Sequence, residues 1–117
     1  MKRQRRINEN LVSYFKLGTR SNTLKIDRNA TFMHELTKAI VFTKLIFEGN
    51  TVVCNGKLNN GNIPDLAVID TEEPIAYEIC HSETQKLTDK KNYPFRIQRI
   101  ETKKLHNILE ELLNAKM

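Results

Sequence analysis

Two short apolar runs, each associated with one carboxylate, constrain the fold of this chain most. Asp65 comes directly before the run at residues 66–69, and Glu78 lies within the run at residues 75–80. The residues between the runs end in Pro74 and are typical of a turn. We therefore expect two neighbouring strands, whose register decides whether the Asp65 and Glu78 carboxylates meet.

The rest of the pattern predicts an α/β fold with a mixed sheet. Apolar residues at helical spacing indicate helices at residues 31–47 and 101–115, with Thr31 as the N-cap of the first. Strands are expected at residues 51–58, 64–70, 74–80 and 95–98, and a polar helix at residues 83–92. Short connections favour antiparallel pairing of the first three strands, whereas the strand–helix–strand unit favours parallel addition of the fourth.

The first 28 residues differ from the rest in charge. They carry eight basic and two acidic side chains, a net charge of +6 in a chain whose total is +5. We expect a basic N-terminal arm over residues 1–28, disordered over residues 1–6, with a possible short helix at residues 7–17 and a short strand at residues 24–26. Such an arm would bind nucleic acid, although a solvated tail is the alternative. The candidate phosphate-binding residues are Lys2, Arg3, Arg5, Arg6, Lys16 and Arg20.

Length and composition indicate one ordinary domain, which we place at residues 29–117. The chain has 117 residues, of which 39% are hydrophobic and 28% charged. No apolar stretch approaches a membrane span, and no signal-peptide core follows the basic N-terminus. Cys54 and Cys80 form no zinc motif and are expected to be reduced and partly buried, in a cytoplasmic protein. A small, Lys- and Asn-rich chain also suits a virus or mobile element, which would place it in the host cytoplasm.

Glu35 adds a third carboxylate, beside the apolar stripe of the helix at residues 31–47. A charge at the edge of a core-facing stripe is costly unless it is paired or binds a metal. Each carboxylate also has an alternative interpretation. Glu35 could be an exposed residue of the first helical turn, favoured by the helix dipole, and Asp65 could accept a hydrogen bond from a backbone N–H in a turn. Glu78 could face solvent from an edge strand. Carboxylate oxygens are ligands that Mg²⁺ prefers, so the three residues together predict a metal site.

The chain resembles the PD-(D/E)xK nuclease superfamily in three features: the pair Pro64-Asp65, Glu78 two positions before Cys80, and the earlier helix with Glu35. Together with the order of the elements, the resemblance covers roughly residues 31–100. It implies a restriction-endonuclease-like αβββαβ core, followed here by a C-terminal amphipathic helix. It also implies that Asp65 and Glu78 bind Mg²⁺ or Mn²⁺ as catalytic residues and that Glu35 supports or completes the site.

The chain departs from this family at the lysine of the motif. Cys80 stands where the motif has lysine, and we interpret it as a small apolar filler. Lys86 and Lys90 lie one helical turn apart in the next expected helix and are the catalytic candidates for the missing charge. The resemblance of residues 90–94 to a Lys-x-x-Tyr-Pro ending favours Lys90, and a solvated helix face is the alternative.

These observations lead to three hypotheses about function. The first is a metal-dependent DNA nuclease, an endonuclease that acts as a homodimer because two sites cut two strands. The second is a catalytically inert nucleic-acid-binding domain on the same fold, as Cys80 would suggest. The third is a dimeric protein-interaction module that associates through the helix at residues 101–117.

Overall fold

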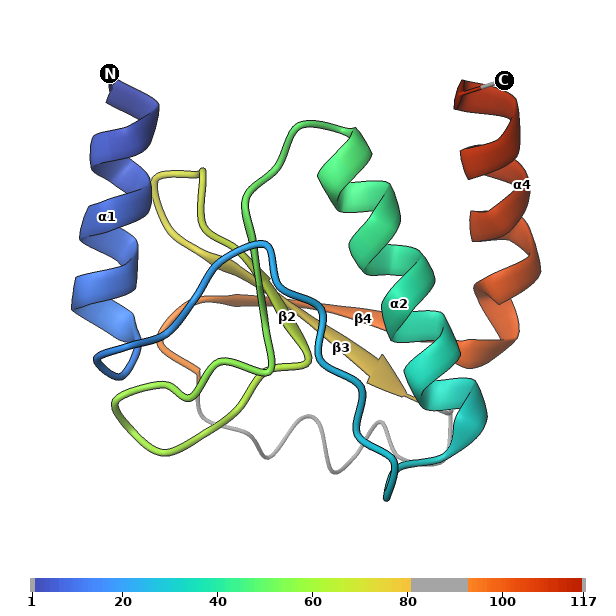
Figure 1. Cartoon of the computed structure of the whole chain (residues 1–117), viewed down its shortest axis with the longest axis horizontal. Coiled ribbons are helices and arrows are strands. Elements are labelled where there is room, and N and C mark those ends of the chain that lie inside the picture. Colours follow the sequence, from blue (N-terminus) through green and yellow to red (C-terminus); the bar gives the residue numbers. More distant parts are fainter. Residues whose placement is uncertain (1, 81–92, 117) are drawn as a thin grey trace.

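The computed structural model describes residues 2–80 and 93–116 of the chain (Figure 1). The expected polar helix at residues 83–92 lies outside these residues. The described elements follow in the order α1 (Lys2–Tyr14), α2 (Phe32–Phe47), β1 (Val52–Cys54), β2 (Leu66–Val68), β3 (Ile75–Cys80), β4 (Arg96–Glu101), the 3-10 helix η2 (Thr102–Lys104) and α4 (Leu105–Lys116).

The four strands form one mixed sheet in the order β1-β2-β3-β4. The pairs β1–β2 and β2–β3 are antiparallel, whereas β4 lies parallel to β3. This arrangement confirms both expectations about strand direction. Since β3 lies between β2 and β4, its side chains are at the centre of the sheet rather than at an edge.

Helices cover both faces of the sheet. α1 packs on one face, where Ile7 and Phe15 join Val53, Ala67 and Ala76 in a buried cluster. α2 and α4 lie together on the other face (Figure 1). There a second buried cluster is formed by Val41, Leu45, Val52, Cys54, Leu66, Val68 and Ile79, with Ile108 of α4 packed against it.

The basic N-terminal segment is part of this core. α1 begins at Lys2, so the expectation of disorder over residues 1–6 is wrong for residues 2–6. Arg3 forms an ion pair with Asp70, with 2.6 Å between Nε and Oδ2, and its guanidinium also donates to the Gly49 carbonyl. Ile7 and Phe15 are buried. Residues 2–15 therefore help to close one face of the sheet.

α2 confirms the helix expected at residues 31–47. The Thr31 side chain accepts a hydrogen bond from the His34 N–H at 3.2 Å, which makes it the N-cap. Gly49, at φ 92°, follows the C-terminal end of the helix in a left-handed conformation that glycine adopts without strain. The cap places His34 and Glu35 in the first turn, at one end of the sheet.

β1 and β2 are shorter than expected, whereas β4 is longer than the strand expected at residues 95–98. β1 ends at Cys54 because Asn55 adopts a left-handed conformation with φ 52°, which asparagine tolerates better than most residues. β2 begins at Leu66 because the Asp65 N–H donates to the Glu78 side chain instead of to a backbone carbonyl.

No strand forms at residues 24–26. This segment instead runs along the free edge of β1, where the Lys25 N–H donates to Cys54 Sγ at 3.3 Å. Nearby, the Asn22 N–H donates to the Val52 carbonyl at 2.6 Å, and Asn22 Oδ1 accepts from the Val52 N–H. The segment therefore covers an exposed sheet edge without joining the sheet.

Candidate functional site

The register of β2 and β3 brings Asp65 and Glu78 together. Leu66 pairs with Tyr77, so one further step along the antiparallel register places Asp65 opposite Glu78. The Asp65 N–H donates to Glu78 Oε2 at 2.8 Å, and the Ile79 N–H donates to Asp65 Oδ2 at 2.8 Å. Each carboxylate thus accepts a hydrogen bond from the backbone of the other strand, which fixes the two groups side by side.

Glu78 is the most deeply buried carboxylate of the site, with 1% of its surface exposed. Its Oε1 accepts a hydrogen bond from the Tyr93 hydroxyl at 2.7 Å. Burial raises the pKa of Tyr93, and the adjacent Glu78 carboxylate raises it further, so the hydroxyl keeps its proton and remains a donor. The alternative of a solvent-facing Glu78 on an edge strand is therefore wrong.

Glu35 is buried and held by three donors. Its Oε1 accepts from the Asp27 N–H at 2.7 Å and from Lys38 Nζ at 2.6 Å. Its Oε2 accepts from His34 Nδ1 at 2.6 Å. Burial alone would raise the pKa of Glu35, but these donors outweigh it and the pKa is lowered, so the carboxylate is ionised at neutral pH. The alternative of an exposed first-turn residue is wrong.

Lys38 was not among the expected site residues, yet its side chain is completely buried beside them. Its Nζ donates to Glu35 and, at 2.7 Å, to Asn55 Oδ1. Asn55 in turn donates its N–H to the Asp65 carbonyl at 3.0 Å, which links Lys38 to the strand end. The spacing of three residues between Glu35 and Lys38 was the available signal, since residues at i and i+3 share a helix face.

His34 was also missed, and it connects two of the three carboxylates. Its Nε2 lies 3.3 Å from Asp65 Oδ2, while its Nδ1 contacts Glu35. The hydrogen bond with Asp65 raises the pKa of His34 to about 9, against the lowering effect of burial and with further support from Glu35. At neutral pH the ring is therefore an imidazolium between two carboxylates.

These contacts determine which of the predicted ligands fit a divalent cation. Among the described residues, no three His, Cys, Asp or Glu side chains are arranged to hold a metal ion. The structure does not bring Glu35 into a common ligand set with Asp65 and Glu78, because the His34 ring lies between Glu35 and Asp65. Asp65 and Glu78 remain an adjacent pair of oxygen donors, which is what Mg²⁺ needs when waters complete its shell.

The other predicted catalytic positions are only partly described. Cys80 is buried and free, and burial raises the pKa of its thiol, which fits the interpretation as a neutral filler. Cys54 is likewise buried and free. Lys86 and Lys90 lie outside the described residues.

Arg3, one of the basic residues expected to bind nucleic acid, does not lie at the carboxylates. Arg3 pairs with Asp70, which follows β2, whereas Asp65 precedes it, so Arg3 is at the opposite end of that strand. Lys2 begins α1. The side chains of Arg5, Arg6, Lys16 and Arg20 are exposed on or just after α1.

Three exposed apolar residues lie within two positions, in the sequence, of residues that belong to the site. Ile26 precedes Asp27, Phe32 lies two residues before His34, and Ile63 lies two residues before Asp65. Their exposed fractions are 58%, 76% and 46%. Asp27, His34 and Asp65 are linked through the hydrogen bonds above, so on each of the three segments an exposed apolar residue lies within two positions of this network.

Comparison with models of protein families, with curated proteins and with solved structures gives no match to this chain. The inference of function therefore depends on the geometry of the site. None of the helices in the described part of the chain is long and apolar enough to span a membrane.

Proposed function

We propose that this protein is a metal-dependent DNA nuclease of the PD-(D/E)xK type, with a restriction-endonuclease-like core. The observation that carries the proposal is the pairing of Asp65 and Glu78. The Glu78 carboxylate accepts a hydrogen bond from the Asp65 N–H, and the Asp65 carboxylate accepts one from the Ile79 N–H. A helix with a buried acidic residue precedes the sheet, and β4 adds parallel to β3, as the resemblance implies.

The chemistry follows from the carboxylate pair. Mg²⁺ or Mn²⁺ held by Asp65 and Glu78 would lower the pKa of a bound water and neutralise charge on the scissile phosphate. Asp65 is held in place by the Ile79 N–H and by His34, and within the described residues no hydrogen bond reaches its other oxygen, Oδ1. Glu35 supports the site by orienting His34 and by binding Lys38.

The surroundings of the pair support a nucleic-acid substrate. The chain carries a net charge of +5, which favours binding of a polyanion. Exposed Phe32 offers an aromatic surface on which an unpaired base can stack, and one stacked base contributes about 1–3 kcal/mol. A single-stranded or structured DNA therefore suits this site better than a regular duplex.

The test is cleavage of labelled single-stranded, duplex and branched DNAs with Mg²⁺ or Mn²⁺. Asp65→Asn and Glu78→Gln keep side-chain size but remove charge, and each should lower the cleavage rate roughly 100-fold or more. Glu72→Gln, an exposed Glu in the turn before β3, is the matched control and should cleave like the wild type. Wild-type rates in either site variant would refute the assignment.

The second candidate is an inert nucleic-acid-binding domain on the same fold. The neutral Cys80 thiol in the lysine position and the engagement of Glu35 by other side chains favour it. Such a domain would bind DNA with the same strong salt dependence in EDTA as in Mg²⁺, and it would cut none of the substrates.

Self-association, the third hypothesis, concerns α4. Leu105, Ile108 and Leu112 of this helix are half-buried, whereas Leu109 and Leu113 are 38% and 53% exposed. α4 therefore closes the core with one side and presents two leucines to the outside. If these leucines form the interface of a homodimer, Leu113→Glu should convert the dimer to a monomer in sedimentation experiments without unfolding it.

A further inference from the structure

A cavity of about 560 Å³ is lined by residues of β4, η2 and α4. Its polar lining is mostly cationic, since Arg99, Lys103 and Lys104 contribute to it against the single carboxylate of Glu101. Cys80 also lines it, and Cys80 is two residues from Glu78 on the same strand. The cavity is therefore lined by more cations than anions, and it reaches to within two residues of Glu78 along β3.

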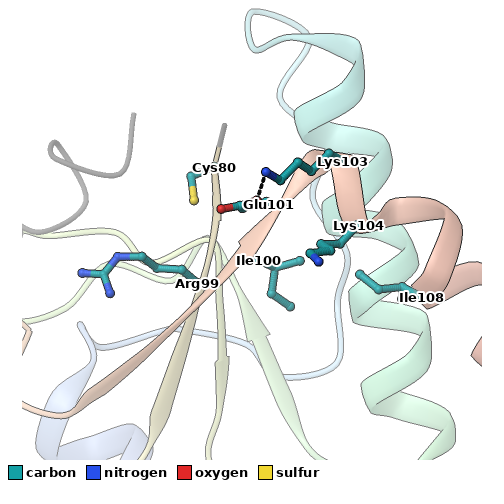
Figure 2. Close-up of a pocket in the computed structure, with 7 residues that line it drawn as sticks. All are labelled: Cys80, Arg99, Ile100, Glu101, Lys103, Lys104 and Ile108. Atoms are coloured by element: carbon teal, nitrogen blue, oxygen red, sulfur yellow. Dashed lines mark ion pairs between the residues drawn. The ribbon is translucent and has the colours of Figure 1, made fainter. Parts of the chain in front are cut away.

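The parallel register of β3 and β4 places Arg99 directly beside Glu78 and Glu101 beside Cys80. Because side chains alternate along a strand, Arg99 and Glu101 share one face of the sheet with Glu78 and Cys80. Figure 2 shows Arg99, Cys80 and Glu101 on one side of β4 and Ile100 and Ile108 on the other. Arg99 is thus directly beside Glu78 and diagonal to Cys80, where the motif would have its lysine.

The charges in the cavity differ in how they are engaged. Lys103 forms an ion pair with Glu101, with 3.1 Å between Nζ and Oε2, in a setting where the lysine is 67% exposed. Besides this pair, two further cationic side chains, Arg99 and Lys104, line the cavity.

We propose that Arg99 supplies the positive charge that the motif lysine would supply, and that Lys103 and Lys104 bind a neighbouring phosphate of the same strand. This inference rests on the proposed nuclease function. Arginine suits the role because it stays protonated and can donate two parallel hydrogen bonds to phosphate oxygens. Arg99 transfers no proton: water adds to phosphorus, the bond to the leaving sugar oxygen breaks, and the proton lost by water reaches that oxygen through solvent.

The experiment compares five proteins: the wild type, Arg99→Ala, Arg99→Lys, the double variant Arg99→Ala/Cys80→Lys, and Arg96→Ala. Arg96 is an exposed arginine of the same strand on the opposite face, which makes it the matched control. For each protein, kcat and KM are measured on the cleaved DNA, and the thermal midpoint is recorded.

Arg99→Ala should lower kcat about 100-fold, with a smaller effect on KM, because the charge acts on the transition state. Adding Cys80→Lys to this variant should restore kcat at least about tenfold, a rescue that a merely structural role of Arg99 would not produce. Arg96→Ala should stay within about twofold of the wild type. If Arg99→Ala does not fold, Arg99→Lys carries the test, with an expected loss of about tenfold because lysine lacks the bidentate geometry.

The two lysines should affect binding rather than chemistry. Lys103→Ala/Lys104→Ala should raise KM. It should also reduce the salt dependence of DNA binding, measured in EDTA, by about 0.7 in log–log slope for each lost phosphate contact to a single strand. An unchanged slope would remove both lysines from the proposed phosphate site.

Failure of the inference can be told apart from failure of the proposed function. If Arg99→Ala cuts like the wild type while Glu78→Gln is inactive, the nuclease proposal stands and the role of Arg99 is refuted. If the wild type cuts nothing, the nuclease proposal fails, and titration with pyrophosphate decides the rest. Equal pyrophosphate binding by Arg99→Ala and Arg96→Ala would then overturn the anion site, whereas loss in Arg99→Ala alone would support it.

Discussion

Replacing Lys38 with methionine should destabilise this protein more than any other single change of a charged residue on α2. The Lys38 side chain is 0% exposed, and its ammonium group contacts Glu35 Oε1 at 2.6 Å and Asn55 Oδ1 at 2.7 Å. Methionine fills a similar volume but leaves the buried Glu35 carboxylate with only the Asp27 N–H and His34 as donors.

The expected size follows from this geometry. Removing one partner of a buried ion pair typically costs about 3–5 kcal/mol, because the other charge stays buried. The lost hydrogen bond to Asn55 adds about 1 kcal/mol. With a urea m-value of about 1–3 kcal/mol/M, the unfolding midpoint should fall by at least about 1 M.

The assay is equilibrium urea unfolding in EDTA, with Lys44→Met as the matched control. Lys44 is on the same helix and pairs with Glu48 at 2.6 Å, but both side chains are partly exposed. That surface pair should contribute about 0.3–0.5 kcal/mol. The double variant Lys38→Met/Glu35→Gln should recover part of the loss, since it removes the uncompensated charge. A cost for Lys38→Met no greater than that for Lys44→Met would refute the reasoning.

Three further predictions concern single residues of the site and the core. The pKa of His34 is raised to about 9, so its imidazolium contributes stability that is fully present below pH 6.5 and is lost as the pH rises to about 9. The midpoint of urea unfolding in EDTA should therefore fall over that pH range. His34→Gln should remove this pH dependence. Gly56→Ala should cost about 1–3 kcal/mol in thermal or urea unfolding, because its Cβ would lie 2.3 Å from a Val53 methyl group. Tyr93→Phe should cost about 1.5–3 kcal/mol by the same measurement, since it removes a hydrogen bond to the buried Glu78 carboxylate, and an unchanged midpoint would show that this bond contributes little.

Features that depend on neighbours in the sequence were predicted well. α2 matches the helix expected at residues 31–47, because its apolar spacing and the Thr31 cap are local signals. The antiparallel and parallel pairings were also predicted, since connection length and right-handed crossovers limit how consecutive strands can pair. The N-terminal six residues were judged disordered because of their charge, whereas Ile7 and Phe15 tie the helix that contains residues 2–6 to the core.

Strand ends were predicted poorly, since they depend on contacts between residues far apart in the chain. The start of β2 is set by an exchange of hydrogen bonds between Asp65 and the strand that contains Glu78, thirteen residues later. The end of β1 depends on Asn55, whose side chain accepts a hydrogen bond from Lys38 on α2. Composition within residues 51–58 or 64–70 contains neither signal.

The site was half predictable for the same reason. The residue types of Asp65, Glu78 and Glu35 marked them as unusual in apolar surroundings, and all three take part in one hydrogen-bonded network. The partners that define their roles, His34 and Lys38, have no unusual surroundings in the sequence. A lysine in an amphipathic helix is ordinarily a solvated residue, and only the close approach of α2 to Asn55 buries this one.

Under the proposed function, the distribution of cations around the carboxylates explains how a cysteine can stand where the motif has lysine. Lys38 approaches the strand ends from α2, on one side of the carboxylate pair, and it is fully engaged by Glu35 and Asn55. It therefore balances charge in the folded protein but has no exposed surface for a substrate. Arg99 approaches from β4 on the other side, where it lines an open cavity. Because Lys38 is engaged within the fold and Arg99 lies beside Glu78 on β4, cations approach the carboxylates from two other elements, and position 80 can be apolar.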